Sequence, residues 1–342
     1  MTETAPIALM GAPGSPYTRK MLAVLRYRRI PYRFLLPPQA AAQDLPQPKV
    51  ALLPTFYLPD ETGAVQAVTD STPLIRRLER ERPGRSVVPS DPALAFLDEL
   101  IEDYADEWLT KAMFHYRWSY APDIAKAAAM LPCWRGFNIP DETLAQRGRA
   151  VSERQIGRLR YVGSNETTGP VIEASYRRFL ERFEDHLRTW PYLLGRRPAA
   201  CDFAVFGQLT QLAEFDPTPM ALTLEVAPRV TAWVGMMEDA SGVEPGDGDW
   251  IDPAVLPETL VALLVEIGRA YAPVMLANAR AVTEGLDEVI AEVDGQAWRQ
   301  QPFPYQAKCL GWLRASHAAL PPAARSTVDA ALARAGLSAL VA

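Results

Sequence analysis

The sequence predicts an α/β unit, followed by an all-helical unit and a mostly helical tail that contains a β-hairpin. Three observations predict this fold class. Strand-like and helical segments alternate as β-α-β and then β-β-α up to residue 86, and apolar residues recur at steps of three and four beyond residue 91. An Asp-Gly pair then separates two strand-like segments near residue 294. The 342 residues suit two domains and an appendage, which we delimit as 1–86, 91–240 and 251–342.

The first unit is predicted to be a mixed four-stranded sheet flanked by helices. Ser15 followed by Pro16 is typical of a helix start, with serine as the N-cap and proline in the first helical position. Because proline cannot sit inside a central strand, Pro54 belongs at a strand's first position or in a turn. The expected elements are strand 7–10, a helix from 16 that stops before Pro31, strand 32–36, irregular segment 37–48, strand 50–58, strand 64–68 and helix 71–82.

The second unit and the tail are predicted to be largely helical. Residues 200–215 are apolar nearly all round, which indicates a helix in the middle of a bundle. Asp294-Gly295 suits a type I′ turn, and we expect the helical segment around Pro273 to break there. The other expected elements are a long helix after 91, helices 171–190 and 227–238, linker 241–250, helical segment 254–284, hairpin 289–298 and helices 305–319 and 322–335.

Composition excludes several classes of function. With 35 Lys and Arg against 41 Asp and Glu, the net charge of −6 argues against a nucleic-acid partner. No run of 18 uncharged apolar residues is present and the N-terminus lacks a basic and apolar leader, so we expect neither a membrane span nor a signal peptide. Three widely spaced cysteines favour a reducing, cytoplasmic location. The three histidines lack metal-ligand spacing, so we expect no metal.

Three local features of the first unit could carry chemistry. A hydroxyl at Ser15 would lie beside unpaired N–H groups at a helix N-terminus, where it could lower the pKa of a bound thiol; it could also be a plain N-cap. A cis bond before Pro54 would offer the main chain of Leu53 to an extended peptide, and the alternative is an edge-strand proline. Asp70 and Ser71, at a strand-to-helix turn, could hold an α-amino acid head group or simply cap the helix.

Together these segments resemble the cytosolic glutathione transferase family, and in particular bacterial members with a C-terminal extension. The resemblance covers roughly residues 5–240. It runs through Gly14-Ser-Pro-Tyr-Thr-Arg-Lys20, Leu53-Pro54, Thr69-Asp-Ser-Thr-Pro-Leu-Ile75, Arg197-Pro-Ala-Ala-Cys-Asp-Phe203 and Ala227-Pro-Arg-Val-Thr-Ala-Trp233.

The resemblance implies a thioredoxin-like N-terminal domain, an all-α glutathione-transferase C-terminal domain, a homodimer and detoxification chemistry with glutathione as co-substrate. By the same resemblance, Ser15 would activate the glutathione thiol, with Tyr17 as an alternative hydroxyl donor. Leu53 would pair with the cysteinyl backbone, with Pro54 cis. The resemblance also implies ligand contacts from Asp70 and Ser71 at the γ-glutamyl end, and Lys49 is a candidate for the glycine carboxylate.

Two departures from the family pattern affect the expectations. Position 15 is serine rather than cysteine, which argues against the disulfide-exchange branch because serine cannot form a mixed disulfide. The family often has Ser or Thr where this chain has Ala199, so Asp202 must find other hydrogen-bond partners.

A second-substrate pocket is expected between the two units. Tyr104, Trp108, Lys111 and His115 share one face of the long helix, and they form either that pocket or part of the core. His115 is either an acid or base or an interior histidine. We expect the extension to pack over the helical unit and narrow the mouth of the cleft, or to be a stabilising appendage.

Three functions remain open from the sequence. The first is a glutathione-dependent transferase that acts on a small hydrophobic or aromatic electrophile. The second is a non-catalytic binding or scaffolding protein with the same fold. The third is a redox enzyme that uses one of the cysteines, Cys133, Cys201 or Cys309.

Overall fold

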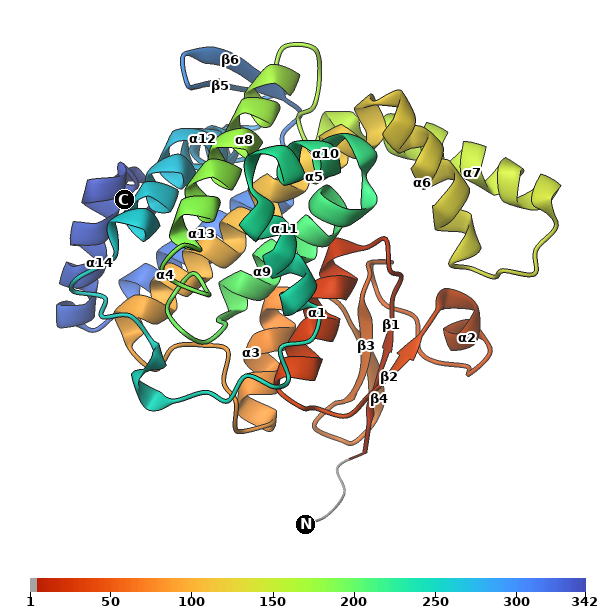
Figure 1. Cartoon of the computed structure of the whole chain (residues 1–342), viewed down its shortest axis with the longest axis horizontal. Helices are drawn as coiled ribbons and strands as arrows, with labels where there is room; N and C mark the ends of the chain where they lie inside the picture. Colours follow the sequence, from red (N-terminus) through yellow and green to blue (C-terminus); the bar gives the residue numbers. More distant parts are fainter. Residues whose placement is uncertain (1–4) are drawn as a thin grey trace.

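A computed structural model gives the structure of residues 5–342 (Figure 1). Residues 1–4 lie outside the described residues. They are part of the N-terminal stretch in which we expect no signal peptide. The N-terminal unit forms a four-stranded sheet in the order β2-β1-β3-β4, with β1 and β2 parallel and the other pairs antiparallel, which confirms the predicted mixed sheet. Its elements are β1 (Ile7–Met10), α1 (Pro16–Tyr27), β2 (Tyr32–Leu35), α2 (Pro37–Ala41), β3 (Thr55–Pro59), β4 (Val65–Val68) and α3 (Ser71–Glu81).

The helical unit is built around a long run that crosses the middle of the molecule. This run consists of α4 (Pro92–Tyr104), a π-helical turn η1 (Ala105–Leu109) and α5 (Thr110–Ser119). In Figure 1, α6 and α7 project sideways beside the sheet domain. The remaining elements are α6 (Ala121–Cys133), α7 (Asp141–Ile156), η2 (Leu159–Tyr161), α8 (Gly169–His186), α9 (Ala200–Leu209), η3 (Thr210–Phe215), α10 (Pro217–Val226), α11 (Pro228–Met237) and η4 (Asp247–Asp249).

Helices α1 and α9 join the two units at close range. A glycine makes this approach possible, because a Cβ at Gly207 would lie 2.6 Å from the carbonyl oxygen of Pro16. Helix α9 is buried along its length, as the apolar sequence predicted. Its Asp202, which lacks a serine or threonine partner at position 199, accepts hydrogen bonds from the N–H groups of Ala199 and Leu193, both at 2.9 Å.

The C-terminal extension packs against the helical unit on the side away from the sheet (Figure 1). It contains α12 (Glu258–Glu284), the hairpin β5 (Val289–Val293) and β6 (Gln296–Gln300), α13 (Pro304–Ala318), α14 (Pro322–Ala335) and α15 (Ser338–Val341). Asp294 and Gly295 have φ of 55° and 73°, as a type I′ turn requires, which confirms the predicted hairpin.

The predicted break at Pro273 is wrong, because α12 is one helix of 27 residues that continues through this proline. An interior proline removes one helical hydrogen bond, but α12 packs against α8, α13 and α14, and residues on both sides of Pro273 are buried. Within residues 5–342, α12 is long and apolar enough to cross a membrane by length and composition alone, and 61% of its most apolar window is buried inside the molecule.

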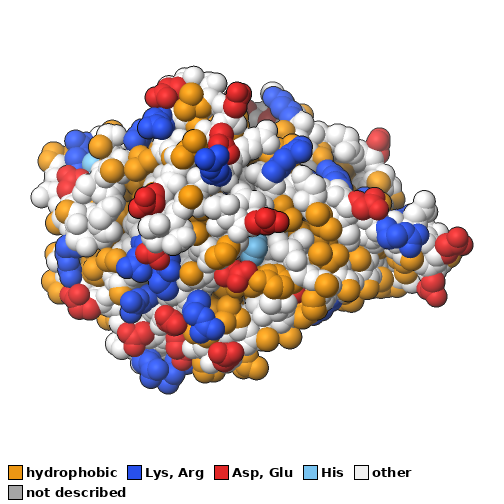
Figure 2. All heavy atoms as spheres, turned by 90° about the horizontal axis from the view of Figure 1, so that it is seen from above, with side chains coloured by type: hydrophobic (Ala, Val, Ile, Leu, Met, Phe, Trp, Pro, Cys, Tyr) orange, Lys and Arg blue, Asp and Glu red, His pale blue; other side chains and the backbone are white. Residues whose placement is uncertain are grey.

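The surface view separates charged from apolar regions. In Figure 2, apolar side chains gather on the part of this face toward α6 and α7, whereas charged side chains are spread over the rest. Met130, Phe137 and Ile156, in and between these two helices, are among the exposed large apolar residues.

Candidate functional site

Ser15 lies where the first strand turns into the first helix. It is the N-cap of α1, and its Oγ accepts a hydrogen bond from the N–H of Thr18 at 3.2 Å. The same hydroxyl donates to the carbonyl oxygen of Leu53 at 3.4 Å. The structure therefore brings Ser15 and Leu53 together, 38 residues apart in sequence, at the positive end of the α1 dipole.

Leu53 precedes β3 and is joined to Pro54 by a cis peptide bond, the isomer that the resemblance implied. Within residues 5–342, the N–H of Leu53 has no main-chain or side-chain acceptor, so this donor is left for water or a bound molecule. Thr55 Oγ1 donates to the carbonyl oxygen of Leu52 at 2.8 Å and holds the segment from the other side.

Asp70 and Ser71 form the turn into α3. Asp70 has φ 82° and ψ 112°, a conformation that a non-glycine residue rarely adopts and that often marks a functional position. The Oδ2 atom of Asp70 accepts a hydrogen bond from the Tyr305 hydroxyl at 2.7 Å. Ser71 is buried, and its Oγ accepts a hydrogen bond from Lys20 Nζ at 3.1 Å.

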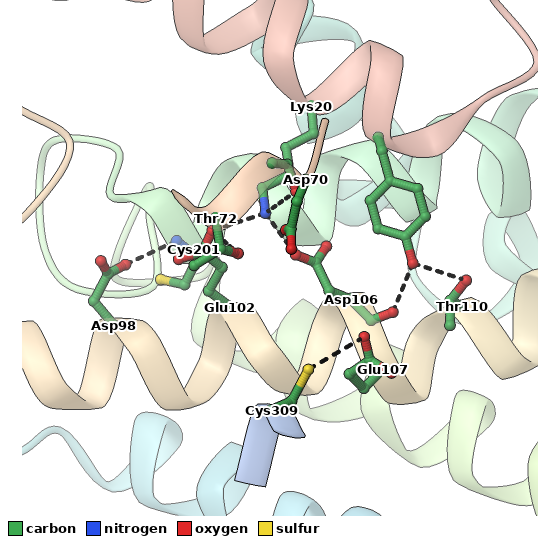
Figure 3. A network of polar contacts seen from close by, with 12 residues as sticks. Lys20, Asp70, Thr72, Asp98, Glu102, Asp106, Glu107, Thr110, Cys201 and Cys309 are labelled. Carbon is green, nitrogen blue, oxygen red and sulfur yellow. Dashed lines mark hydrogen bonds and ion pairs between the residues drawn. The ribbon is translucent and has the colours of Figure 1, made fainter. Parts of the chain in front are cut away.

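Lys20 is a site residue that the sequence analysis did not single out. From α1 its Nζ donates to Ser71, to Glu102 Oε1 at 2.8 Å and to Asp106 Oδ2 at 2.6 Å. Figure 3 shows Lys20 reaching toward Glu102 and Asp106, with Asp70 and Thr72 beside it. Burial alone lowers the pKa of Lys20, but the charges of Asp106 and Glu102 outweigh it and raise the pKa above its ordinary value.

Two further residues hold the loop that carries Ser15. Arg117 Nη1 donates to the carbonyl oxygen of Gly14 at 3.1 Å, and Gln211 Nε2 donates to that of Pro13 at 3.3 Å. Arg117 is itself fixed by a buried ion pair with Asp216, at 2.9 Å. The helical unit therefore positions the start of α1, a role that the local sequence around Arg117 does not reveal.

Among residues 5–342, the side chains of Tyr17 and Lys49 make no hydrogen bond with the Ser15 hydroxyl. The hydroxyl of Tyr17 donates to the carbonyl oxygen of Asp106 at 2.8 Å, and burial raises its pKa well above the ordinary value. Its phenol therefore points into the contact with η1. Lys49 is exposed, and among residues 5–342 its side chain makes no hydrogen bond or ion pair.

The predicted pocket face of the long helix is filled by the extension. Tyr104 packs edge-on against Tyr271, and Trp108 packs against Trp298 with 5.2 Å between ring centroids. Lys111 Nζ donates to Gln300 Oε1 at 3.2 Å. Because these side chains are buried against α12 and β6, this face forms core, and the alternative of an open pocket is not what the structure shows.

His115 belongs to an interior network. Its Nδ1 lies 2.7 Å from Ser164 Oγ and its Nε2 lies 3.0 Å from Glu173 Oε1. Tyr120 donates to the same carboxylate oxygen. Ser164 and His115 are both buried, and both imidazole nitrogens are engaged, so the network fits the interpretation of a hydrogen-bonded interior histidine.

The cysteines lie in poor settings for thiolate chemistry. Burial raises the pKa of Cys201 well above its ordinary value, and it also raises the pKa of Cys309. The Sγ of Cys133 donates to the carbonyl oxygen of Ala129 in the last turn of α6, away from any helix N-terminus. A cysteine redox function therefore has little support in this structure.

Side chains cover both ends of the Ser15–Asp70 region. At one end, the Trp134 ring at the end of α6 packs on the loop before Ser15, because a Cβ at Gly14 would lie only 2.4 Å from this ring. At the other end, the Tyr305 hydroxyl contacts Asp70. Two clefts in residues 5–342 lie elsewhere, one of about 330 Å³ beside Arg29 and one of about 720 Å³ beside Arg158. None of Ser15, Leu53, Asp70 and Ser71 lines either cleft.

Comparisons with solved structures list glutathione S-transferases at low similarity. One from Methylobacterium radiotolerans, in complex with glutathione sulfonate, is 18% identical with a TM-score of 0.42, over 69% of this chain and 92% of that one. One from Methylobacillus flagellatus, with glutathione bound, is 18% identical with a TM-score of 0.40, over 69% and 96%. FzlA from C. crescentus is 15% identical with a TM-score of 0.41, over 67% and 86%. A search of curated protein sequences gives no significant match.

Family models match part of each of the first two units. The glutathione S-transferase N-terminal domain matches residues 9–86, which include Ser15, Leu53, Asp70 and Ser71. The glutathione S-transferase C-terminal domain matches residues 146–235, and the extension from residue 251 lies outside both matches. The two models match in their family order, on a thioredoxin-like sheet domain and a helical domain, and together they support a glutathione S-transferase-like family protein.

Proposed function

We propose that the chain is a glutathione-dependent transferase in which the Ser15 hydroxyl stabilises the thiolate of bound glutathione. The thiolate then attacks a small hydrophobic or aromatic electrophile. On binding, the single Ser15 hydroxyl proton would turn from the Leu53 carbonyl oxygen to the thiolate. That hydrogen bond and the positive end of the α1 dipole both favour the charged form of a nearby thiol. Lowering the thiol pKa by about 1.5–2 units would correspond to about 2–3 kcal/mol of differential stabilisation.

The position of Ser15 is the observation that carries this proposal. Its Oγ lies 3.4 Å from the carbonyl oxygen of Leu53, whose N–H is unpaired among residues 5–342. A peptide that pairs with the main chain of Leu53 would hold its middle residue beside Ser15. Asp70 and Ser71 then supply a carboxylate and a hydroxyl for the amino-acid end.

The finer properties of the proposed enzyme are expectations that rest on the sequence and on the family resemblance. We expect a cytoplasmic homodimer that needs no metal, with domain limits at 1–86, 91–240 and 251–342. Sedimentation of the full chain tests the dimer.

Substitution of Ser15 tests the mechanism directly. In Ser15→Ala, the pKa of bound glutathione, followed by the ultraviolet absorption of the thiolate, should rise by about 1–2 units, and kcat/KM should fall about 10- to 100-fold. Tyr17→Phe is the matched control, because that hydroxyl donates to Asp106 instead. It should leave the thiol pKa unchanged. Equal thiol pKa values in Ser15→Ala and the unaltered chain would remove Ser15 from the mechanism.

A non-catalytic binding or scaffolding protein is the second candidate. The observation that favours it is that side chains already contact both ends of the site. Trp134 packs against Gly14, and the Tyr305 hydroxyl is hydrogen-bonded to one oxygen of Asp70. Calorimetric titration with glutathione separates the two candidates. A Kd for glutathione below the millimolar range supports the transferase. Millimolar or no binding, with no change in the titration for Asp70→Ala, supports the scaffold.

A further inference from the structure

The extension reaches the predicted amino-acid end of the site through one side chain. Tyr305, in the first turn of α13, donates a hydrogen bond to Asp70 Oδ2 at 2.7 Å across 235 positions of sequence. This phenol–carboxylate contact is partly buried. A hydrogen bond to a charged group is among the stronger polar contacts in proteins, so the contact restricts the orientation of the Asp70 carboxylate.

Tyr305 is itself held from several sides. Asn278 of α12, which is fully buried, donates to the carbonyl oxygen of Phe303 at 2.9 Å and accepts from its N–H at 2.8 Å. These two bonds fix the residue that caps α13. The Tyr305 ring packs against Phe303 and lies edge-on to Trp312, with centroids 6.3 and 6.2 Å apart. The phenol is therefore held in place before any ligand arrives.

The Tyr305 contact leaves one Asp70 oxygen able to accept a hydrogen bond from a ligand. A carboxylate has two oxygens, and Oδ1 of Asp70 has no side-chain or main-chain donor among residues 5–342. Burial raises the pKa of Asp106, and the charges of Glu102 and Asp70 add to that rise. The Oδ1 atom of Asp106 is buried and has no hydrogen-bond partner in the same part of the chain. Figure 3 shows these two carboxylates side by side near the Lys20 amine.

The charges around Asp70 suit a cation. The Lys20 ammonium is already engaged by Ser71, Glu102 and Asp106, so all three of its N–H groups are used. Among residues 5–342, the Asp70 carboxylate therefore has no cationic side chain as a fixed partner. A ligand group that carries N–H donors and a positive charge would fit there, and an α-ammonium has both properties.

We infer that Tyr305 is a positioning residue for glutathione binding: its hydroxyl holds the Asp70 carboxylate so that this group can accept the ammonium at the γ-glutamyl end. The inference rests on the proposed function and assigns the extension a part in ligand recognition. Tyr305 acts through Asp70 and need not touch the ligand. Removing its hydroxyl leaves the Asp70 side chain free to rotate.

The test uses the full chain and two ligands, glutathione and glutaryl-Cys-Gly, which lacks only the amino group. Tyr305→Phe should weaken glutathione binding about tenfold while changing the Kd of glutaryl-Cys-Gly less than about twofold. KM for glutathione should rise with kcat nearly unchanged. Tyr120→Phe is the matched control, because it removes another phenol–carboxylate bond, to Glu173, away from Asp70. It should change neither Kd.

The other outcomes overturn the inference in distinguishable ways. Unchanged glutathione binding in Tyr305→Phe would mean that Asp70 needs no help from the extension. Equal losses for both ligands would indicate a structural role, and tighter binding of glutathione would show that Tyr305 blocks the site. If the unaltered chain binds neither ligand, the proposed function fails and this inference fails with it.

Discussion

Lys20 Nζ and Asp106 Oδ2 lie 2.6 Å apart in a buried ion pair that joins α1 to the π-helical turn η1. The same ammonium donates to Ser71 at the start of α3. One buried cation therefore ties together the helix that follows Ser15, the turn that carries Asp70 and the long helix of the second unit. The positions of the candidate site residues depend on this contact.

Replacement of Lys20 tests how much the contact contributes. Lys20→Met should lower the free energy of unfolding by about 3–5 kcal/mol, because it leaves the buried carboxylate of Asp106 without its cation. Urea unfolding measures the loss. Lys49→Met removes an exposed lysine and should stay within about 0.5 kcal/mol of the unaltered chain. Small losses in both variants would show that Lys20 is not essential to the interface.

Two helical glycines should respond in opposite directions to alanine. In Gly207→Ala the new Cβ would lie 2.6 Å from the Pro16 carbonyl oxygen, a main-chain atom that cannot easily move, so stability should fall by about 1–3 kcal/mol. In Gly235→Ala nothing lies within 4 Å of the new Cβ, so stability should rise by up to about 1 kcal/mol. Thermal unfolding of both variants measures the pair, and a gain in Gly207→Ala would argue against the close approach of α1 and α9.

Sequence could predict the parts of this fold that short segments determine. Ser15-Pro16 is a complete helix start by itself, and Asp294-Gly295 specifies its turn by itself. Both were predicted with their elements because neighbouring residues are enough to select the conformation. Ser15 and Leu53 were expected to be close through the family resemblance, and the structure has them in contact.

The rest depends on contacts between distant segments. Tyr305 meets Asp70 only because Asn278 in another helix anchors the start of α13, and nothing local to residue 305 indicates this. Lys20 is buried where α1 packs against α9, and its partners Glu102 and Asp106 lie more than 80 residues later in the chain, so its neighbours in sequence do not indicate either contact. The Tyr104 face has the same spacing whether a pocket or the extension covers it, so periodicity could not decide between them.

Asp103 should make stability depend on pH. Burial and the charges of neighbouring carboxylates raise its pKa from 3.8 to about 7 in the folded protein. The folded state therefore holds a proton between these values that the unfolded state has released, so stability falls as pH rises through this range. Asp103→Asn keeps an acceptor for the Tyr271 hydroxyl but cannot ionise.

The two chains should therefore diverge with pH. From about pH 5 to about pH 8, the unaltered chain should lose a few kcal/mol of stability relative to Asp103→Asn, because each unit of pKa shift corresponds to about 1.4 kcal/mol. Urea unfolding of both chains at several pH values measures the difference. A difference that stays constant with pH would show that Asp103 does not titrate in this range.

Asn278 is expected to link the stability of the extension to ligand binding. Asn278→Ala leaves both the N–H and the carbonyl oxygen of Phe303 without their buried partner, so the free energy of unfolding should fall by about 2–4 kcal/mol. Asn278→Asp keeps the acceptor for the Phe303 N–H but loses the donor to its carbonyl oxygen. Asn138→Ala, which changes an exposed asparagine between α6 and α7, is the control.

Glutathione binding by Asn278→Ala shows whether the effect of this change stays within the extension or reaches Asp70. Because Asn278 anchors the turn that carries Tyr305, Asn278→Ala should also raise the Kd for glutathione under conditions where the chain remains folded, whereas Asn138→Ala should not. Adding Tyr305→Phe to Asn278→Ala should then cost little further affinity, since both changes release the same carboxylate. Additive losses in the double variant would mean that Asn278 affects the site by a route other than Tyr305 and Asp70.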